Sequence, residues 1–424
     1  MRKKIFISIL LVVFILVSAS VGIAAIQMQQ KKKNELYKQI EIFSDALAVI
    51  QSDYVDELNN KDLIYGALKG MLASLDPYSD FMDPQKYKEL KVETEGKFGG
   101  LGIEITLKDG LLTVVTPYED TPAWKAGVKP NDRIVKINNE FTRDITLDDA
   151  VKKLRGNPGE AVAITIYREQ EKKTLDLNIV RDIIKIKDIK KAVILEDGIG
   201  YIQLLEFREN TADDFDIALE KLKKEGMDCL ILDLRNNPGG ILDVAVSVVE
   251  KFIEKNKLVL STKGRKPEQS SQYLSHSKNP ILDIPIVVLI NDGSASGSEI
   301  VAGALQDYKR AIILGTKSFG KGSVQSVIPL PDGSALKLTT SKYFTPLGRQ
   351  IHGIGVVPDI AVEEPAVDSV KKDKESEKIF KEVEKNDSAP EKKDNTVEGK
   401  FDYKNDLQIV RAMDVLKAVK IYKK

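Results

Sequence analysis

Residues 229–240 have the sequence CLILDLRNNPGG, which predicts a buried strand that ends in a glycine-rich turn. The alternation of apolar strands with amphipathic helices extends from residue 198 to residue 314. We expect strands at 200–205, 229–234, 284–291 and 311–314, and helices at about 212–225, 242–252 and 298–308. This pattern is typical of a largely parallel α/β sheet, in which functional sites form at the carboxyl ends of the strands.

A smaller region upstream, at about 96–183, contains short strand-like segments at 102–107, 111–116, 132–138, 162–168 and 174–180. One helix is expected within it, because Thr146 and Asp149 form a capping pair at its start. We therefore predict a small β domain that is inserted between an N-terminal helical region, 34–95, and the α/β body, 184–366.

The N-terminal helical region carries apolar side chains at three- and four-residue steps: Ile40, Phe43, Leu47, Ile50 and Tyr54. Such a stripe packs either within its own chain or against a second copy of the chain. The pattern predicts helices here, and it leaves these two uses of the stripe open.

The first 33 residues are predicted to be a signal anchor or a signal peptide. Residues 5–26 carry no charge and follow three basic residues, and at 1.5 Å per residue such a run can span a bilayer core of about 30 Å. Small residues at 18–20 resemble a cleavage site, but the apolar run continues past them, which favours an anchor. We expect the body of the protein to lie outside the cytoplasmic membrane.

The C-terminal part of the chain divides into a tether and a helix. Lys, Asp and Glu make up more than half of residues 367–400, so this segment cannot bury enough apolar surface to fold and should be a flexible tether. In the segment 401–424, Asp406 can cap a helix with Ile409, Met413 and Leu416 on one face. We expect that helix to dock on a surface that the sequence does not identify.

The composition excludes several classes of chemistry. The chain of 424 residues has 64 basic and 64 acidic side chains, so it offers no basic face for a nucleic acid. One cysteine, Cys229, and two histidines, His276 and His352, leave little material for disulfides or metal sites. We expect no cofactor and no metal, and catalysis must use Ser, Lys, Asp, Glu or Tyr.

Residues 291–300, NDGSASGSEI, lie between a predicted strand and a predicted helix. A small-residue turn that opens a helix places a hydroxyl beside free backbone N–H groups, which can stabilise an oxyanion. The simpler interpretation is that one of the serines only caps the helix.

Residues 315–325, GTKSFGKGSVQ, nearly match a phosphate-binding loop, with Gly315, Gly320 and Lys321 in place. Gly322 stands where that loop needs a hydroxyl, and a strand-like segment replaces the helix that should follow. Glycines on both sides of Lys321 suggest instead that the lysine points into a tight site. The simpler interpretation is a surface lysine in a turn.

Together the two motifs indicate a serine nucleophile with a lysine base. A serine hydroxyl needs a base, and a lysine can serve if burial keeps its amine neutral. Gln325 could orient the amine without adding charge. A carboxylate beside the amine would keep it protonated, so we expect Asp307 to act structurally at the end of its helix or at one remove from the amine.

Two further glycine-rich turns can supply backbone N–H groups. Gly239 or Gly240 could provide a second oxyanion donor, unless the turn only needs glycine dihedrals. In the small β domain, the segment Lys97–Ile105 could bind a chain-terminal carboxylate and accept a peptide as an added strand, unless it is an ordinary turn.

From about Leu75 to Ile360 the chain resembles the carboxyl-terminal processing peptidases, also called tail-specific proteases. The resemblance rests on motifs that occur in the same order along the chain: Leu75-Asp76-Pro77, Gly100-Leu101-Gly102-Ile103, Thr121-Pro122-Ala123, Ala126-Gly127, Asp132-Arg133-Ile134, Leu234 to Gly240, Gly293 to Ser296, Phe319 to Gly322 with Gln325, and Gly355 to Asp359.

The resemblance implies a crotonase/ClpP-like peptidase body with a mainly parallel sheet, an inserted PDZ domain at 96–183 and a peptidase core at 184–366. In that family the PDZ domain binds the tail of a protein substrate and a Ser/Lys dyad cuts the substrate. The peptide-binding residues carried over by motif are Gly100, Leu101, Gly102 and Ile103. Arg155, at the end of the PDZ helix, is a candidate for relaying tail binding to the active site, and its simpler interpretation is a solvated surface arginine.

Carried over by motif, Ser296 is the nucleophile, Lys321 the general base and Gln325 the residue that orients the lysine. Gly297 and Gly240 are the implied oxyanion donors through their backbone N–H groups. Two more serines, Ser294 and Ser298, flank the nucleophile, and the separation of 25 residues between Ser296 and Lys321 favours Ser296.

We therefore expect a membrane-tethered serine endopeptidase that recognises protein substrates by their exposed C-terminal tails. The expected partners are these substrates, the membrane through the N-terminal segment, and a second copy of the chain through the N-terminal helices; no nucleic acid is expected. One alternative is a non-catalytic PDZ-type adaptor on a degenerate protease fold. Another is a nucleotide-binding α/β protein, which the missing hydroxyl at Gly322 disfavours.

Overall fold

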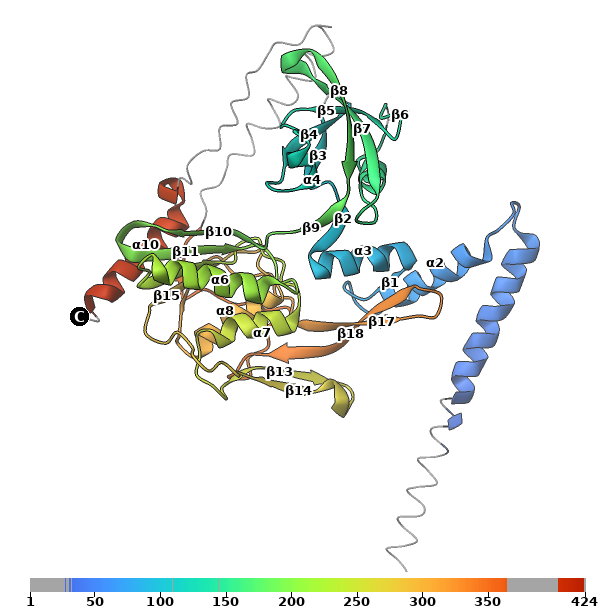
Figure 1. Cartoon of the computed structure of the whole chain (residues 1–424). Coiled ribbons are helices and arrows are strands. Elements are labelled where there is room, and N and C mark those ends of the chain that lie inside the picture. Colours follow the sequence, from blue (N-terminus) through green and yellow to red (C-terminus); the bar gives the residue numbers. More distant parts are fainter. Residues whose placement is uncertain are drawn as a thin grey trace, which may run out of the picture. The chain divides into compact units, whose positions relative to one another are not determined.

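The computed structural model describes residues 33–108, 110–143, 145–363 and 403–422, together with residues 27, 30 and 31 (Figure 1). The chain divides into two units, Met1–Ser74 and Leu75–Lys424, which we describe separately. The predicted anchor, residues 5–26, and the predicted tether, 367–400, lie outside the described residues. Within the described residues, no helix is both long and apolar enough to cross a membrane.

The described part of the first unit contains a helix over residues 33–53 and helix α2 (Asn60–Ala73). Asn59 caps α2, since its side chain accepts a hydrogen bond from Lys61 N at 2.9 Å. Ile40, Phe43 and Ile50 of the predicted stripe are exposed, with fractions of 50%, 47% and 44%. The predicted helices are present here, and most of the stripe is exposed among the described residues.

The body of the second unit is built on a six-stranded sheet in the order β10-β11-β12-β15-β16-β19. Its strands are β10 (Ile189–Ile194), β11 (Ile199–Leu204), β12 (Cys229–Asp233), β15 (Ile286–Ile290), β16 (Ile312–Gly315) and β19 (Ile360–Ala361). β10 pairs with β11 in antiparallel fashion, and the other four pairings are parallel. The predicted alternation of strands and helices is confirmed, with shifts of one or two residues at the element ends.

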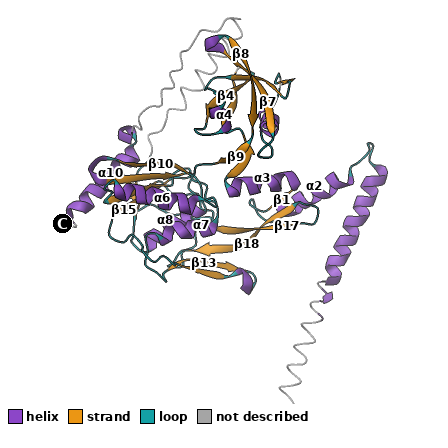
Figure 2. Ribbon diagram, viewed as in Figure 1, coloured by secondary structure: helices purple, strands orange, loops and turns teal. Residues whose placement is uncertain are grey.

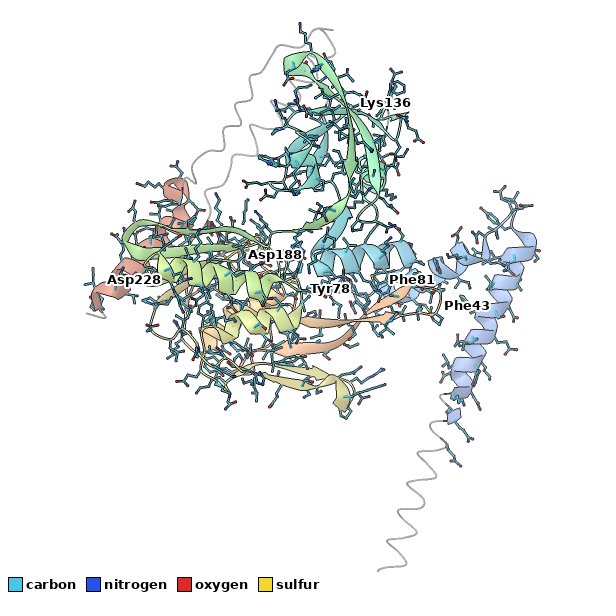
Figure 3. All side chains as sticks on the ribbon, in the orientation of Figure 1. Phe43, Tyr78, Phe81, Lys136, Asp188 and Asp228 are labelled. Atoms are coloured by element: carbon cyan, nitrogen blue, oxygen red, sulfur yellow. The ribbon has the colours of Figure 1, made fainter. Side chains whose placement is uncertain are left out.

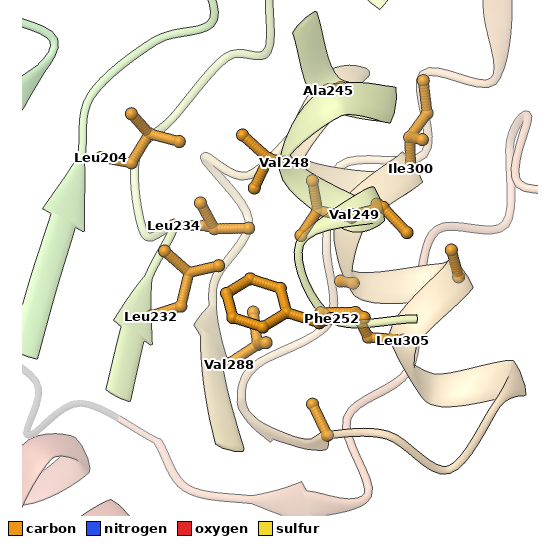
Figure 4. Close-up of a cluster of buried hydrophobic side chains, with 14 of the residues drawn as sticks. Leu204, Leu232, Leu234, Ala245, Val248, Val249, Phe252, Val288, Ile300 and Leu305 are labelled. Atoms are coloured by element: carbon orange, nitrogen blue, oxygen red, sulfur yellow. The ribbon is translucent and has the colours of Figure 1, made fainter. Parts of the chain in front are cut away.

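The central strands are buried on both faces, and alternate side chains enter two different cores. One core joins the sheet to α6 (Thr211–Lys224), α7 (Leu242–Glu250) and α8 (Gly297–Asp307). Figure 4 shows part of it, with Leu232 and Leu234 of the segment around β12 facing Val248 and Phe252. Because side chains of a strand alternate in direction, Ile231 enters the core on the other face.

The second face of the sheet is covered by α10 (Leu407–Tyr422), the predicted C-terminal helix. Ile409, Met413 and Leu416 are buried there against residues such as Tyr201. Asp406 caps this helix, since its Oδ1 accepts hydrogen bonds from the N–H groups of residues 408 and 409 at 3.1 and 3.0 Å. The docking surface that the sequence left open is thus the back of the protein's own central sheet.

A second, antiparallel sheet was not predicted as such. It contains β1 (Asp80–Met82), β13 (Leu258–Gly264), β14 (Ser271–Leu274), β17 (Ser323–Pro329) and β18 (Ala335–Phe344). Strand β18 pairs with β1, β13 and β17, always in antiparallel fashion. The body is therefore mixed α/β, and the prediction of a mainly parallel body describes only one of its two sheets.

The small β domain is built mainly of strands, drawn in orange in Figure 2. They form a sheet in the order β3-β4-β5-β7-β8, with β6 beside β5. Its elements are β3 (Ile103–Lys108), β4 (Leu111–Pro117), α4 (Pro122–Lys125), β5 (Arg133–Ile137), β6 (Glu140–Phe141), α5 (Leu147–Leu154), β7 (Ala161–Arg168) and β8 (Lys173–Val180). The predicted cap of α5 is confirmed, because Thr146 Oγ1 accepts a hydrogen bond from Asp149 N at 3.1 Å. Strand β3, which carries the predicted peptide-binding edge, is the terminal strand of this sheet.

Helix α3 (Pro84–Glu95) leads into the small domain through β2 (Lys97–Gly100), and the chain returns through β9 (Asp182–Lys185). β2 and β9 pair as a two-stranded antiparallel ribbon. The predicted helical region 34–95 is thus shared between the two units, since α3 and β1 belong to the second unit.

Candidate active site

Ser296 lies at the turn between β15 and α8, immediately before the first residue of the helix. Its backbone has φ 51° and ψ −111°, which is a strained conformation for a residue with a side chain and costs about 1–3 kcal/mol. An ordinary capping serine has an extended backbone. The simpler interpretation, in which this serine only caps the helix, therefore does not explain its geometry.

The two neighbouring serines have structural hydrogen bonds. Ser294 Oγ donates to the Leu234 carbonyl at 2.7 Å, and Ser298 Oγ donates to the Asn237 carbonyl at 2.9 Å. Both serines are fully buried, whereas Ser296 is only half-buried. Of the three, Ser296 is the serine that a substrate can reach.

The buried carboxylate of Glu299 joins the Ser296 turn to the Lys321 turn. Its Oε2 accepts hydrogen bonds from Ser296 N at 2.9 Å and Lys321 N at 2.8 Å. Its Oε1 accepts hydrogen bonds from Ser318 Oγ at 2.6 Å and Gly320 N at 2.7 Å. One side chain thus brings together the two motifs that are separated in the sequence.

We did not predict this role of Glu299 from the sequence. Burial raises the pKa of its carboxyl, and the four hydrogen bonds oppose that shift by stabilising the ionised form. The sequence did carry a signal, because a glutamate three residues after a serine at a helix start is the pattern of a capping box.

Lys321 lies in the turn between β16 and β17, where its backbone is closely confined. A Cβ atom at Gly322 would lie 2.3 Å from His352 N, so only glycine fits beside the lysine. The half-buried side chain places Nζ 5.3 Å from the centroid of the Tyr78 ring. Burial lowers the pKa of the Lys321 amine and nearby Lys337 lowers it further, while Glu299 raises it.

Gln325, on β17, makes hydrogen bonds away from the lysine. Its Nε2 donates to Ser323 Oγ at 3.2 Å and to Thr339 Oγ1 at 3.3 Å, and Thr339 Oγ1 donates to Asp76 Oδ1 at 3.2 Å. Over the part of the chain that the structure describes, no hydrogen bond joins Lys321 Nζ to Gln325 or to Ser296. Glu299 thus brings the backbones of Ser296 and Lys321 together, whereas the Gln325 side chain is held by Ser323 and Thr339.

Tyr343 provides a second link between the two turns. Its hydroxyl is within hydrogen-bond distance of the carbonyl oxygens of Ser296 and Lys321. The side chain is 1% exposed, and burial raises the pKa of its hydroxyl well above the usual value. Tyr343 is therefore a neutral hydrogen-bond donor.

The turn that contains Gly239 and Gly240 packs against Ser296. A Cβ atom at Gly239 would lie 2.6 Å from Ser296 Cβ, and one at Gly240 would lie 2.1 Å from the Phe207 carbonyl oxygen. Gly239 N donates to Asn237 Oδ1 at 2.9 Å, so it is already engaged. Among the described residues the N–H groups of Gly240 and Gly297 have no hydrogen-bond partner, which leaves these two amides for a ligand.

Asp307 has the structural position that we expected. Its carboxylate accepts a hydrogen bond from Leu347 N at 2.8 Å and forms an ion pair with Arg349, at the end of α8. The nucleotide-binding alternative fails at Gly322, because strand β17 follows that residue where a phosphate-binding loop requires a helix. No group of three or more potential metal ligands is found among the described side chains.

The predicted peptide-binding residues extend from the end of β2, at Gly100, through a turn at Leu101 and Gly102 to Ile103, the first residue of edge strand β3. Two carbonyls of this turn accept hydrogen bonds from the small domain itself. The Leu101 oxygen accepts from Ala123 N at 2.9 Å, and the Gly102 oxygen accepts from Tyr118 N at 2.8 Å. The amides of Leu101 and Gly102 make no hydrogen bond to any described residue. Gly102 has φ +75°, and a Cβ atom there would lie 2.3 Å from Thr121 Cβ, so the turn requires glycine.

Arg155 follows α5 and is exposed, as the simpler interpretation expects. Its guanidinium carbon lies 4.3 Å from the centroid of the Phe98 ring, in strand β2. The arginine therefore contacts the ribbon that connects the small domain to the body.

Three family models match the sequence. The peptidase family S41 model matches residues 198–362, a PDZ domain model matches residues 113–168, and a model of the activating protease CtpB N-terminal domain matches residues 13–86.

Curated relatives match most of the chain. A carboxy-terminal-processing protease of Bartonella bacilliformis is 45% identical over 374 residues, which cover 87% of this chain and 85% of the relative. The carboxy-terminal processing protease CtpB of Bacillus subtilis is 36% identical over 81% of this chain and 72% of the relative. Among solved structures, a photosystem II D1 C-terminal processing protease is 30% identical, covers 76% of this chain and 92% of that chain, and has a TM-score of 0.45.

Proposed function

Since the chain belongs to peptidase family S41, among the carboxy-terminal processing serine proteases, we propose that its PDZ domain selects protein substrates by their C-terminal tails and that a Ser296/Lys321 dyad cleaves them. The observation that carries the proposal is the position of Glu299. Its carboxylate binds the backbone N–H groups of both Ser296 and Lys321, so the two turns form one site.

The reaction begins with proton transfer from Ser296 Oγ to the neutral amine of Lys321. The serine oxygen then attacks the carbonyl carbon of the peptide, and the tetrahedral oxyanion accepts hydrogen bonds from the N–H groups of Gly240 and Gly297. The lysine returns its proton to the leaving amine, and an acyl-enzyme forms on Ser296. Lys321 then takes a proton from the water that attacks the ester. It passes this proton to Ser296 Oγ as the ester bond breaks, which releases the new C-terminus and restores the neutral lysine and the serine hydroxyl.

Two features support this mechanism. Burial lowers the pKa of Lys321, which increases the neutral fraction that can act as a base. The strained backbone of Ser296 holds its side chain at the start of α8, where free N–H groups can stabilise negative charge.

The lysine must move before it can react. Its amine lies over the Tyr78 ring, and the reaction requires it to turn toward Ser296, where Gln325 orients it. We propose that tail binding to the PDZ domain favours this turn, with Arg155 as the relay. The contact of Arg155 with Phe98 in β2 supports a relay through the ribbon.

Tail recognition uses the turn of Gly100, Leu101, Gly102 and Ile103. The unpaired amides of Leu101 and Gly102 would bind the terminal carboxylate, and the substrate would add as a strand to the edge of β3. A non-catalytic adaptor would need only this turn and the edge of β3. It would not need the strained backbone and close packing around Ser296, so these features do not favour that alternative.

We also propose a location and an assembly. The uncharged run at 5–26 behind three basic residues supports a signal anchor, or a cleaved signal peptide, with the catalytic body outside the cytoplasmic membrane. The exposed apolar residues of the helix over 33–53 support pairing with a second copy of the chain.

Helices on both faces of the six-stranded sheet are consistent with a crotonase/ClpP-like core.

The test compares cleavage of an unstructured reporter that ends in small apolar residues by the wild-type chain, Ser296→Ala and Lys321→Ala. Lys317→Ala is the matched control, because Lys317 is exposed and lies in the same turn. We expect cleavage by the wild type and the control only, with all four proteins folded by circular dichroism. Cleavage by Ser296→Ala or Lys321→Ala at a rate close to that of the wild type would show that the dyad is misassigned.

A further inference from the structure

The PDZ domain is joined to the rest of its unit by two segments, which enter and leave through the β2–β9 ribbon. At the base of the ribbon, Ile186 N donates a hydrogen bond to the Gly96 carbonyl at 2.8 Å. Helix α3 precedes this point and Asp188 follows it. Any movement of the PDZ domain against the body must act on these two segments.

Arg208 binds both segments with one side chain. Its Nε donates a hydrogen bond at 2.9 Å to the carbonyl of Glu93, in the last turn of α3. Its two terminal nitrogens form ion pairs with Asp188, which is labelled in Figure 3, and with Glu206. The planar guanidinium suits this task, because it donates in several fixed directions at once.

The residues after Arg208 extend the contact with α3. Glu209 N donates to the Thr94 carbonyl and Asn210 Nδ2 donates to the Glu95 carbonyl, each at 3.3 Å. Carbonyls in the last turn of a helix lack the usual partner four residues further on and favour a nearby cation, and here, among the described residues, only that of Glu93 accepts a local bond, from Gly96 N at 3.3 Å. Segment 208–210 therefore holds the end of α3 at three successive residues.

The ion pairs of Arg208 are largely buried. The side chain of Asp188 is 2% exposed and that of Arg208 is 12% exposed. Thr211 Oγ1 also donates to Asp188, at 2.5 Å. Burial raises the pKa of Glu206, and Arg208 opposes that rise. Without the guanidinium, these carboxylates would lose their cation in a site with little water.

Phe207, directly before Arg208, contacts both proposed oxyanion donors. Its N–H donates to the Gly239 carbonyl at 2.8 Å, and its carbonyl accepts from Ile241 N at 2.7 Å. These two hydrogen bonds hold the residues on either side of Gly240. A Cβ atom at Gly297 would lie 2.9 Å from Phe207 Cδ2. Phe207 is fully buried, so a shift of its backbone must displace these glycines.

We propose that Arg208 is a positioning residue that transmits the position of the PDZ domain, through Phe207, to the oxyanion-binding backbone of Gly240 and Gly297. This inference rests on the proposed function. Tail binding would move α3 and the segment at Asp188 as a pair, and Arg208 would carry that movement across one peptide bond into the active site.

The test uses the full chain and two unstructured reporters that differ only in their last two residues, Ala-Ala or Asp-Asp. For each protein we compare kcat and KM on both reporters, and the affinity for a fluorescent peptide with the Ala-Ala end. We expect the wild type to prefer the Ala-Ala reporter by about tenfold or more. In Arg208→Ala this preference should fall to about twofold or less through kcat, with peptide affinity within about twofold of wild type.

Further variants separate coupling from folding. Asp188→Asn keeps the side-chain shape and should reduce the preference in the same way, and the double variant should be no worse than either single variant. Arg208→Lys should restore part of the preference, and Arg265→Ala, at an exposed arginine, should leave it unchanged. An unchanged preference in Arg208→Ala, or a loss of peptide binding that explains the loss of preference, would overturn the inference.

The outcomes also distinguish this inference from the proposed function. If neither reporter is cut by the wild type, or if Ser296→Ala cuts them equally well, the proposed function fails and the inference fails with it. If cleavage depends on Ser296 and on the tail but the Arg208 variants keep the preference, only the inference fails.

Discussion

Replacing Glu299 by glutamine should separate two effects of this buried carboxylate. The side chain accepts four hydrogen bonds, of which two hold the backbone of Ser296 and Lys321. A glutamine amide keeps one oxygen acceptor, and its NH2 group faces donors where the second oxygen was. The oxygen that remains can serve only one of the two pairs of donors.

The magnitude follows from that loss. Hydrogen bonds to a charged group contribute about 1.5–3 kcal/mol each, and losing two of them is partly offset because a buried charge is removed. A net loss of about 3 kcal/mol in holding the reactive geometry corresponds to a decrease in kcat of about 100-fold. Glu299→Gln should therefore retain about one hundredth of the wild-type activity.

The second effect concerns pH. The negative charge of Glu299 raises the pKa of Lys321, so its removal should lower that pKa further. Activity requires the neutral amine and is lost as the pH falls through the lysine pKa. The acid limb of the pH–activity profile should therefore shift to lower pH in Glu299→Gln, although the maximum rate falls.

The assay is reporter cleavage by wild type and Glu299→Gln between about pH 5 and 10, with thermal unfolding followed for both proteins. Gln85→Glu, on exposed helix α3, is a control for a change of charge far from the site. A kcat within about twofold of wild type, or an acid limb that moves to higher pH, would contradict these two roles of Glu299.

Three further predictions concern the surroundings of the dyad. Gly322→Ala should reduce kcat about tenfold or more, because the new Cβ would lie 2.3 Å from His352 N, whereas Gly70→Ala, which has open space, should leave reporter cleavage unchanged. Tyr343→Phe should reduce kcat by about five- to tenfold through the loss of one hydrogen bond worth about 1 kcal/mol, measured by the same assay; an unchanged kcat would contradict this role. Arg235→Ala should destabilise the body by about 3–5 kcal/mol in urea unfolding, because Arg235 pairs with the buried Asp233 and with Asp406; an unchanged midpoint would show that this pairing is not needed.

The central sheet and the small β domain could be predicted because their signals are local. Apolar runs such as Cys229–Leu234 mark buried strands, and Thr146 with Asp149 marks the start of a helix. The apolar face of the last helix was visible, but its docking surface was not, since a stripe does not identify what covers it.

The antiparallel sheet could not be predicted in the same way. Strand β18 mixes apolar and polar residues, and its pairing with β1 joins Phe81 to Leu336, a separation that no local pattern reports. The direction of the Gln325 side chain likewise depends on Thr339 of β18 and on Asp76, near the start of the second unit. Tertiary contacts decide these features.

The individual residues of the candidate site could be predicted from the sequence, but the contacts that join its turns could not. Ser296, Lys321 and the glycines are marked by unusual local composition. Glu299, which holds the two turns together, looks like an ordinary acidic residue in the first turn of a helix. Its function is visible only when the turn of Lys321 is placed beside it.

The most direct test of the dyad is the site at which a serine-reactive fluorophosphonate labels the protein, located by peptide mass spectrometry. We expect one adduct, on Ser296. Its rate of formation should increase as the pH rises through the lowered pKa of Lys321, and the adduct should not form in Lys321→Ala. An adduct on Ser294 or Ser298, or labelling of Ser296 at an unchanged rate in Lys321→Ala, would contradict the Ser296/Lys321 dyad.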